Sequence, residues 1–150
     1  MTFKKALDHF EKRVSETTNK SETKLYQEFI RILTRLNERD LSAADIIAIE
    51  TELKRLNLDA TVAHKKRYYK KALRQFEKYL MDTFSLTTKG YYTKTGIALG
   101  MTFGLLFGVV LLSNLERSMG ISLGMSLGMF IGLIIGRNLD EKALSTGKMV

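Results

Sequence analysis

Hydrophobic and polar positions follow two different patterns along this chain of 150 residues. Over residues 1–86, apolar side chains recur at steps of three and four among charged ones, which is the period of an amphipathic helix. Residues 95–136 hold only two charged residues, which separate two long apolar stretches. The first pattern predicts helices in water and the second predicts helices in a bilayer. We therefore expect an all-α protein, with an N-terminal cytosolic bundle of about four helices and a C-terminal transmembrane helical hairpin.

The four helices of the first part are expected near residues 3–17, 22–38, 42–57 and 59–86. Ser42 and Asp45 form a capping-box pattern at the start of the third helix, and Asp59 is the expected cap of the fourth. The side chains predicted to face the core are Phe3, Leu7, Phe10 and Val14, then Leu25, Phe29, Ile32, Leu33 and Leu36, then Ile46, Ile49, Leu53 and Leu56, and finally Val62, Tyr69, Leu73, Phe76, Leu80 and Phe84.

Two later segments are long enough to cross a bilayer as helices. No charged residue occurs in Thr95–Leu115 or in Ser118–Gly136, which hold 21 and 19 residues. At the rise of an α-helix each spans about 30 Å, the thickness of the hydrocarbon core. Glu116 and Arg117 lie between the two segments, and because charges are costly at mid-bilayer they mark the turn of a hairpin.

Basic residues flank this hairpin mainly on one side. The turn holds only Arg117, whereas five others lie near the opposite ends: Lys89, Lys94, Arg137, Lys142 and Lys148. Because basic segments stay in the cytoplasm, we expect both termini to be cytoplasmic. The chain then divides into a cytosolic helical domain (1–86), a juxtamembrane linker (87–94), the hairpin (95–136) and a cytosolic tail (137–150).

Nine of the eleven glycines repeat at a strict step of four within the hairpin. Residues four apart lie on one helix face, so each span carries a groove that lets another helix approach closely. These tandem GxxxG motifs predict close helix packing, in the right-handed crossing that such faces favour. The glycines are Gly96, Gly100, Gly104 and Gly108 on the first span, and Gly120, Gly124, Gly128, Gly132 and Gly136 on the second.

A second set of small residues lies on the opposite face of each span: Ala98, Thr102, Ser122 and Ser126. A second packing face favours neighbours on both sides, as in a ring of hairpins whose hydroxyls face a lumen or bond across helices. The alternative is that each hydroxyl bonds back to the carbonyl four residues earlier on its own helix.

The fourth helix is strongly basic on one side. Residues 60–94 hold nine Lys and Arg against two Asp and Glu, which accounts for most of the net charge of +8. The favoured interpretation is contact with anionic lipid headgroups, and the alternative is a nucleic-acid or nucleotide surface that also uses Tyr68 and Tyr69. The residues are Lys65, Lys66, Arg67, Lys70, Lys71, Arg74 and Lys78.

Catalytic and metal-binding patterns are missing from the sequence. The chain has no cysteine, and its two histidines, His9 and His64, have no metal-ligand spacing. No phosphate-binding loop and no nucleophile elbow occurs either. We therefore expect no enzymatic activity, no metal and no cofactor.

The segment from Thr87 to Lys148 resembles the glycine-zipper two-span region of small bacterial inner-membrane proteins. The resemblance rests on the tandem GxxxG repeats and on the polar exit after Gly136, RNLDEKA. It implies an inner-membrane protein that forms a homo-oligomer. Glycine-rich spans are also similar to those of pore-forming and channel proteins.

Three functions follow as hypotheses. The first is an oligomeric membrane protein assembled through its GxxxG faces, as a pore or membrane-perturbing effector gated by the cytosolic helices. The second is a passive anchor that presents a helical interaction module to a cytosolic protein. The third is a nucleic-acid or nucleotide sensor at the membrane, which uses the basic helix.

Overall fold

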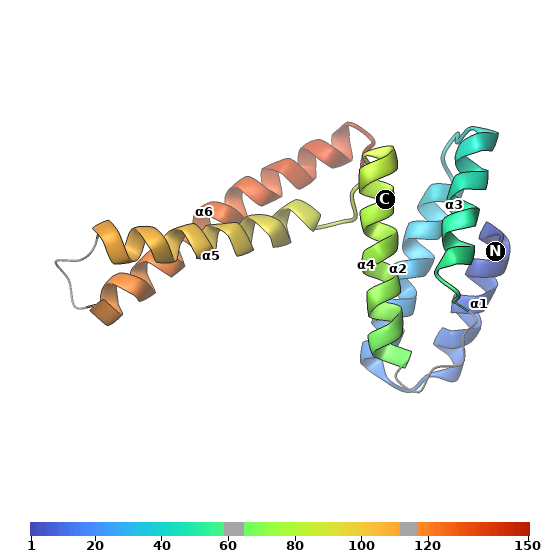
Figure 1. Ribbon diagram of the computed structural model, residues 1–150, viewed down its shortest axis with the longest axis horizontal. Coiled ribbons are helices and arrows are strands. Elements are labelled where there is room, and N and C mark those ends of the chain that lie inside the picture. Colours follow the sequence, from blue (N-terminus) through green and yellow to red (C-terminus); the bar gives the residue numbers. More distant parts are fainter. Residues whose placement is uncertain (59–64, 112–116) are drawn as a thin grey trace. The chain divides into compact units, whose positions relative to one another are not determined.

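A computed structural model of the chain describes residues 1–58, 65–111 and 117–150, and regular structure in these residues is entirely helical (Figure 1). The predicted all-α class is therefore confirmed for the described residues. The helices are α1 (Phe3–Glu16), α2 (Lys20–Asn37), α3 (Ala43–Arg55), α4 (Lys65–Phe84), α5 (Tyr91–Leu111) and α6 (Arg117–Ser145). They fall into two compact units, residues 1–86 and residues 87–149, and Val150 is grouped with the first.

Side-chain caps begin the helices of the first unit. The capping box predicted for α3 is confirmed, because the Ser42 hydroxyl accepts from the Asp45 amide at 3.1 Å and the Asp45 carboxylate accepts from the Ser42 amide at 3.2 Å. Thr2 and Asn19 cap α1 and α2 with one bond each: the Thr2 hydroxyl accepts from the Lys5 amide, and the Asn19 side-chain oxygen accepts from the Ser21 amide. The cap predicted at Asp59 lies outside the described residues.

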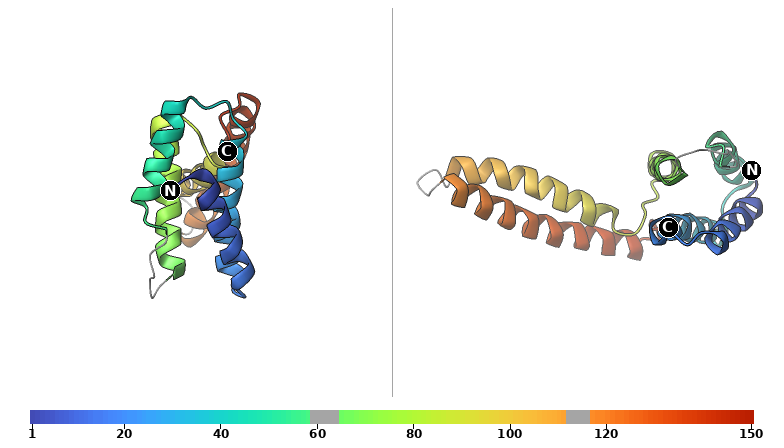
Figure 2. Two further views of the ribbon diagram at one scale, coloured as in Figure 1. Left: turned by 90° about the vertical axis from the view of Figure 1, so that its right-hand side faces the viewer. Right: turned by 90° about the horizontal axis from the view of Figure 1, so that it is seen from below.

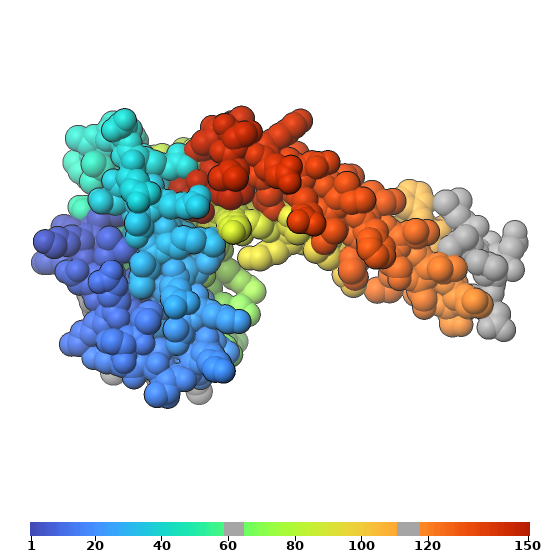
Figure 3. All heavy atoms as spheres, turned by 180° about the vertical axis from the view of Figure 1, so that it is seen from behind, coloured from blue at the N-terminus to red at the C-terminus, as the bar shows by residue number. Residues whose placement is uncertain are grey.

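Large apolar side chains from all four helices of this unit share one core. Figure 3 shows the side chains of α1 and α2 in contact along the two helices. At the centre, the rings of Phe10 and Phe29 stack with centroids 4.3 Å apart. The largest fully buried core side chains are Phe10, Tyr26, Phe29, Ile32, Leu33, Leu36, Ile49, Leu53, Leu58, Tyr69, Phe76 and Leu80.

The predicted core differs from this one at several positions: Ile46 is not part of it, and the buried core residues that were not predicted are Ala6, Tyr26, Leu58, Ala72, Leu86 and Val150. Ile46 is 38% exposed, because the core contacts of α3 begin one turn later, at Ile49. Tyr26 was not predicted to face the core, yet it is buried against Tyr69 with ring centroids 5.2 Å apart. Burial raises the pKa of the Tyr26 phenol; Glu22 raises it further, and Arg13 opposes the shift. Val62 lies outside the described residues.

In the second unit, α5 and α6 run antiparallel and lie side by side along their length (Figure 2). The stretches Tyr91–Val110 and Ser118–Ser145 are long and apolar enough to cross a membrane. This confirms the predicted pair of C-terminal helices with membrane-spanning length and composition. Glu116, predicted in the turn, lies outside the described residues, and α6 begins at Arg117.

Both helices extend beyond their uncharged stretches on the side away from the turn. α5 begins at Tyr91, and α6 continues from Gly136 to Ser145 through good helix formers such as Leu139 and Ala143. Gly147 then adopts a φ of 68°, and the Lys148 amide donates to the Ala143 carbonyl at 2.8 Å. This arrangement is a glycine-terminated helix end. Much of the predicted linker and tail is thus helical.

Candidate helix-packing and headgroup-contact sites

The glycines of α5 and α6 face each other within one chain. The register is regular: Gly96 lies opposite Gly132, Gly100 opposite Gly128, Gly104 opposite Gly124, and Gly108 opposite Gly120. At the end of the hairpin away from its turn, Gly136 lies against the backbone of Tyr92 and Thr93. Each predicted glycine groove therefore has the other groove of the same chain as its partner.

The two backbones approach so closely that no side chain fits between them. A Cβ atom added to Gly108 would lie 2.5 Å from the Gly120 carbonyl oxygen and 3.0 Å from the Gly124 Cα. The same holds at Gly96, Gly100, Gly104, Gly124, Gly128, Gly132 and Gly136, where the nearest backbone atom would be less than 3.0 Å away. Cα–H groups then face carbonyl oxygens across the interface, a weak contact that recurs between closely packed helices. Even alanine is too large for this interface.

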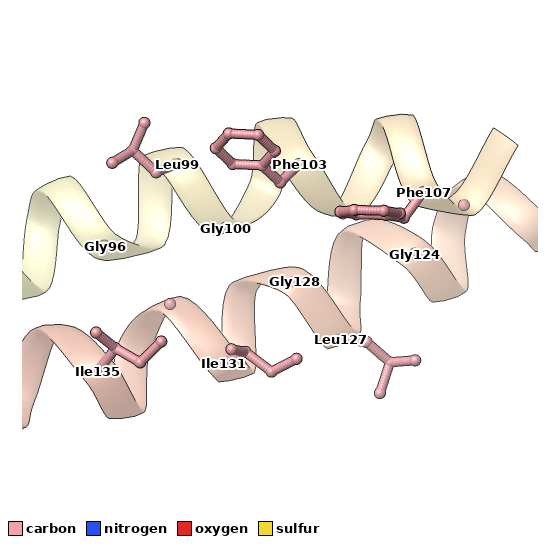
Figure 4. A pocket seen from close by; sticks show the side chains of 13 residues that line it. Gly96, Leu99, Gly100, Phe103, Phe107, Gly124, Leu127, Gly128, Ile131 and Ile135 are labelled. Carbon is pink, nitrogen blue, oxygen red and sulfur yellow. The ribbon is translucent and has the colours of Figure 1, made fainter. Parts of the chain in front are cut away.

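An apolar groove of about 550 Å³ runs along one side of the glycine seam. Figure 4 shows its flanks: Leu99, Phe103 and Phe107 project from α5, and Leu127, Ile131 and Ile135 project from α6. These six side chains are between 53% and 59% exposed. On the other side of the seam Ile97, Met101, Ile121, Met125 and Leu133 are half-buried. The seam is therefore open to a groove along one flank, and the other flank carries these half-buried side chains together with the exposed Leu105, Val109 and Met129.

The second set of small residues lies on the outside of the hairpin. Ala98, Thr102, Ser122 and Ser126 are all exposed. The Thr102 hydroxyl donates to the Ala98 carbonyl at 3.0 Å, and the hydroxyls of Ser122 and Ser126 donate to the Ser118 and Ser122 carbonyls at 2.8 Å. Each hydroxyl thus bonds to the carbonyl four residues earlier on its own helix, which is the second of the two arrangements expected from the sequence. The hydroxyls therefore need neither a neighbouring helix nor a water-filled lumen to satisfy their donors.

Asp140 of α6 caps the start of α5. Its carboxylate accepts from the Tyr92 amide at 3.1 Å, from the Thr93 amide at 3.0 Å and from the Thr93 hydroxyl at 2.6 Å. Backbone amides at a helix start have no partner within the helix, and a negative charge there also favours the helix dipole. One side chain thus joins the ends of the two helices away from the turn.

Asp140 was not among the predicted site residues, although the glycine pattern contains a signal for it. The step of four that passes through Gly132 and Gly136 lands next on Asp140, and the same step back from Gly96 lands on Tyr92. Asp140 therefore continues the packing face of α6, and the amide of Tyr92 lies on the continued face of α5. The segment before α5 also contacts the segment after α6, because the Thr87 amide donates to the Lys148 carbonyl at 2.8 Å.

The predicted cations of α4 form one exposed surface, here called the basic surface. All seven are exposed: Lys65, Lys66, Arg67, Lys70, Lys71, Arg74 and Lys78. The opposite face of α4 buries Tyr69, Ala72, Leu73, Phe76 and Leu80 in the core. The other six cations are thus separated from the apolar side chains around the helix, whereas Lys65, the first residue of α4, lies by its helical spacing on the same side as Phe76.

Both tyrosines of the nucleic-acid alternative bind the end of α3 and the residues after it. The Tyr68 hydroxyl donates to the Leu56 and Asn57 carbonyls at 2.8 and 2.9 Å, and the Tyr69 hydroxyl donates to the Leu58 carbonyl at 2.7 Å. Tyr69 is fully buried and Tyr68 is half-buried. Tyr69 consequently offers no ring face on which a base could stack.

Histidine does not build a metal site in the described part of the chain. His9 is half-buried, its Nε2 lies 3.4 Å from the Tyr69 hydroxyl, and its ring packs edge-on against Phe10. His64 lies outside the described residues. No group of three or more His, Asp or Glu side chains close enough to share a metal ion occurs among the described residues.

Comparisons of the chain with known protein families, with characterised proteins and with solved structures find no match.

Proposed function

We propose that this protein is a membrane-anchored helical module, in which α5 and α6 form a two-span hairpin and residues 1–86 form a four-helix bundle in the cytosol. The observation that carries the proposal is the pairing of the glycine faces inside one chain. Because the glycine faces of α5 and α6 contact each other, the remaining, outward surface of the hairpin contacts the surrounding medium. That surface is apolar, with Val110 at 70%, Phe130 at 66% and Leu127 at 59% exposure.

Lipid is the medium that suits this surface. In water, contiguous apolar side chains of this number would drive aggregation, and glycine in a helix interior costs about 1 kcal/mol relative to alanine. In a bilayer the backbone keeps its helical hydrogen bonds, because leaving them unmade costs several kcal/mol each. The 21 residues of α5 rise about 31 Å, which matches the hydrocarbon core.

The bacterial inner membrane, with both termini in the cytoplasm, is the location that we propose. Arg137 and Lys142 on α6 and Lys89 and Lys94 around the start of α5 support this orientation, because basic residues stay on the cytoplasmic side. The resemblance to glycine-zipper two-span proteins supports the inner membrane. The helical module would then present its surface to a cytosolic protein.

A homo-oligomer is the second candidate, and the exposed small residues favour it. Ala98, Thr102, Ser122 and Ser126 interrupt an outer surface of otherwise bulky side chains, so a neighbouring helix could approach there. The glycine faces are not needed for this assembly, because they are already paired in the hairpin. A pore would be one form of such an oligomer.

Single-cysteine labelling tests the anchor, and the absence of native cysteine makes each introduced thiol unique. Exposed positions are Ser118 at the turn end and Thr146 at the other end of α6. In intact cells with a permeable outer membrane, a membrane-impermeant maleimide should label Ser118→Cys. It should leave Thr146→Cys unlabelled until the inner membrane is lysed.

Lys4→Cys, in the exposed first turn of α1, is the matched reporter for the first unit. It should behave like Thr146→Cys if residues 1–86 are cytosolic. Labelling of Thr146→Cys before lysis would overturn the orientation, and recovery of the chain in the soluble fraction would overturn the anchor itself.

A further inference from the structure

We propose that the basic surface of α4 binds the anionic phosphate headgroups of the leaflet on the cytoplasmic side of the hairpin. The inference rests on the proposed function, because the hairpin supplies the bilayer. It adds a second, electrostatic contact between the helical module and the membrane. The ligand class is the acidic phospholipid headgroup.

The direction of the basic surface is fixed by the fold of the first unit. Tyr69, Phe76 and Leu80 are fully buried on the opposite face of α4. The hydroxyls of Tyr68 and Tyr69 also bind carbonyl groups at and beyond the end of α3, which holds the rotation of α4 about its axis. The cations therefore cannot turn into the core, and they remain available to a partner outside the unit.

The chemistry of this surface suits a polyanion better than a folded protein partner. α4 carries seven Lys and Arg against two carboxylates, Glu77 and Asp82. None of the large apolar side chains exposed in the described residues belongs to α4. Protein interfaces draw most of their affinity from a few buried aromatic or apolar anchors, which this surface lacks. Headgroup binding needs only cations near the phosphate plane.

Chain length brings the bilayer within reach of α4. Only the six residues Ser85–Gly90 separate the end of α4 from the start of α5. Six residues extend about 20 Å at most, so the end of α4 cannot move far from the membrane. Tethering at this distance gives a high effective concentration, and cations within about one Debye length of the phosphates, 8 Å, contribute to binding.

A nucleic acid is the competing polyanion, and the described geometry disfavours it. Proteins that bind single strands combine cations with aromatic rings on which bases stack. Tyr69 is buried, and Tyr68 is half-buried with its hydroxyl engaged. The lipid surface needs no stacking ring, so it is the partner that these contacts favour.

Fluorescence quenching in lipid nanodiscs tests the proposal on the full chain. A fluorophore on Gln75→Cys, an exposed position between Lys71 and Lys78, reports on the basic surface. The discs contain phosphatidylcholine alone or with about one third phosphatidylglycerol, and each carries a headgroup-attached nitroxide quencher. We expect strong quenching only in the anionic discs, and its loss at about 1 M salt, where the Debye length falls to about 3 Å.

Charge variants give the matched comparison. The triple variant Lys66→Gln, Lys70→Gln, Arg74→Gln should lower the ratio of quenched to unquenched probe about tenfold or more. The control Lys5→Gln, Lys20→Gln, Lys24→Gln removes the same charge from exposed positions of α1 and α2 and should leave the quenching unchanged. The same probe on Gln27→Cys of α2, also exposed, should show no dependence on anionic lipid.

Three results would overturn the proposal. If the chain inserts into the discs but the Gln75→Cys probe is equally quenched with and without anionic lipid, headgroup binding is refuted while the anchor stands. If the probe responds to single-stranded RNA in phosphatidylcholine discs and not to anionic lipid, the partner is a nucleic acid. If the chain does not insert into the discs at all, both the proposed membrane anchor and this inference are refuted.

Discussion

At the scale of single residues, the missing Cβ of glycine sets the distance between two helices. At Gly104 an added Cβ would meet the backbone of both Gly124 and Gly128. Those atoms cannot move aside as a flexible side chain can, so a larger residue must push the helices apart. Ala98, two turns away but on the outer surface, has room for a larger side chain.

Replacement of Gly104 by leucine should separate α5 from α6. Helices with ordinary side chains pack 8–10 Å apart, so we expect the distance between them to rise by about 2 Å. Spin labels on Leu106→Cys and Ser122→Cys, which are exposed on the outer surfaces, measure this distance by pulsed electron resonance in nanodiscs.

The matched control for Gly104→Leu is Ala98→Leu, which adds the same kind of side chain outside the seam. It should leave the label distance unaltered. An unchanged distance in Gly104→Leu, with widening in Ala98→Leu instead, would mean that the glycine faces do not form this interface.

At the scale of helices, the ends of α5 and α6 away from the turn are joined by polar contacts. Asp140 accepts three hydrogen bonds from Tyr92 and Thr93, and the Thr87 amide binds the Lys148 carbonyl. Along the glycine seam, from the pair Gly96–Gly132 to the pair Gly108–Gly120, the backbones of the two helices are in close contact. Hydrogen bonds therefore fix the register of α5 against α6 at the end away from the turn, and the glycines allow the close contact between the two backbones to continue along both helices.

Asp140→Ala should weaken the first turn of α5. Loss of a helix-capping side chain costs about 0.5–2 kcal/mol, and we expect a value near the upper end because two amides and a hydroxyl lose their acceptor. Hydrogen exchange of the Tyr92 and Thr93 amides should accelerate about tenfold, while amides in the middle of α5 remain protected.

Asp140→Asn retains one acceptor oxygen and should give an intermediate rate. Glu141→Ala, at the exposed neighbouring position, serves as the control and should leave both amides as slow as in the parent chain. Equal acceleration in the Glu141 and Asp140 variants would argue against a specific cap.

At the scale of the whole molecule, cis pairing of the glycines changes what they imply about assembly. Tandem GxxxG faces predict close helix packing, and in this chain the partner of each face is the other span. The hydroxyls of Thr102, Ser122 and Ser126 bond to their own helices, so they do not call for a polar lumen. An anchor meets these observations without any second copy.

Ion flux through liposomes distinguishes the anchor from the pore. Purified protein reconstituted at a high protein-to-lipid ratio should give the same flux as empty vesicles. Cross-linking through Ala98→Cys measures oligomers in the same preparation, with exposed Leu106→Cys as the matched position among bulky side chains.

Flux that rises with protein content, together with disulfide dimers at Ala98→Cys but not at Leu106→Cys, would favour the oligomeric pore over the anchor. Oligomers without flux would keep the anchor and add an assembly through the small-residue face.

The sequence by itself determined the helices and which two of them are long and apolar enough to cross a membrane. The step of three and four located the core of residues 1–86, and the uncharged stretches located α5 and α6, because hydrophobic period and length are local properties. Ser42 and Asp45 even specified a helix start, since a capping box involves only neighbouring residues.

Only the tertiary structure decided which faces meet. Periodicity finds a glycine face but not its partner, and the pairing of Gly104 with Gly124 depends on how the two helices register. The burial of Tyr26 against Tyr69 and the exposure of Ile46 depend on which side chains of other helices pack at those positions, which periodicity does not contain. Asp140 caps α5 because antiparallel packing brings residues 48 positions apart within hydrogen-bonding distance.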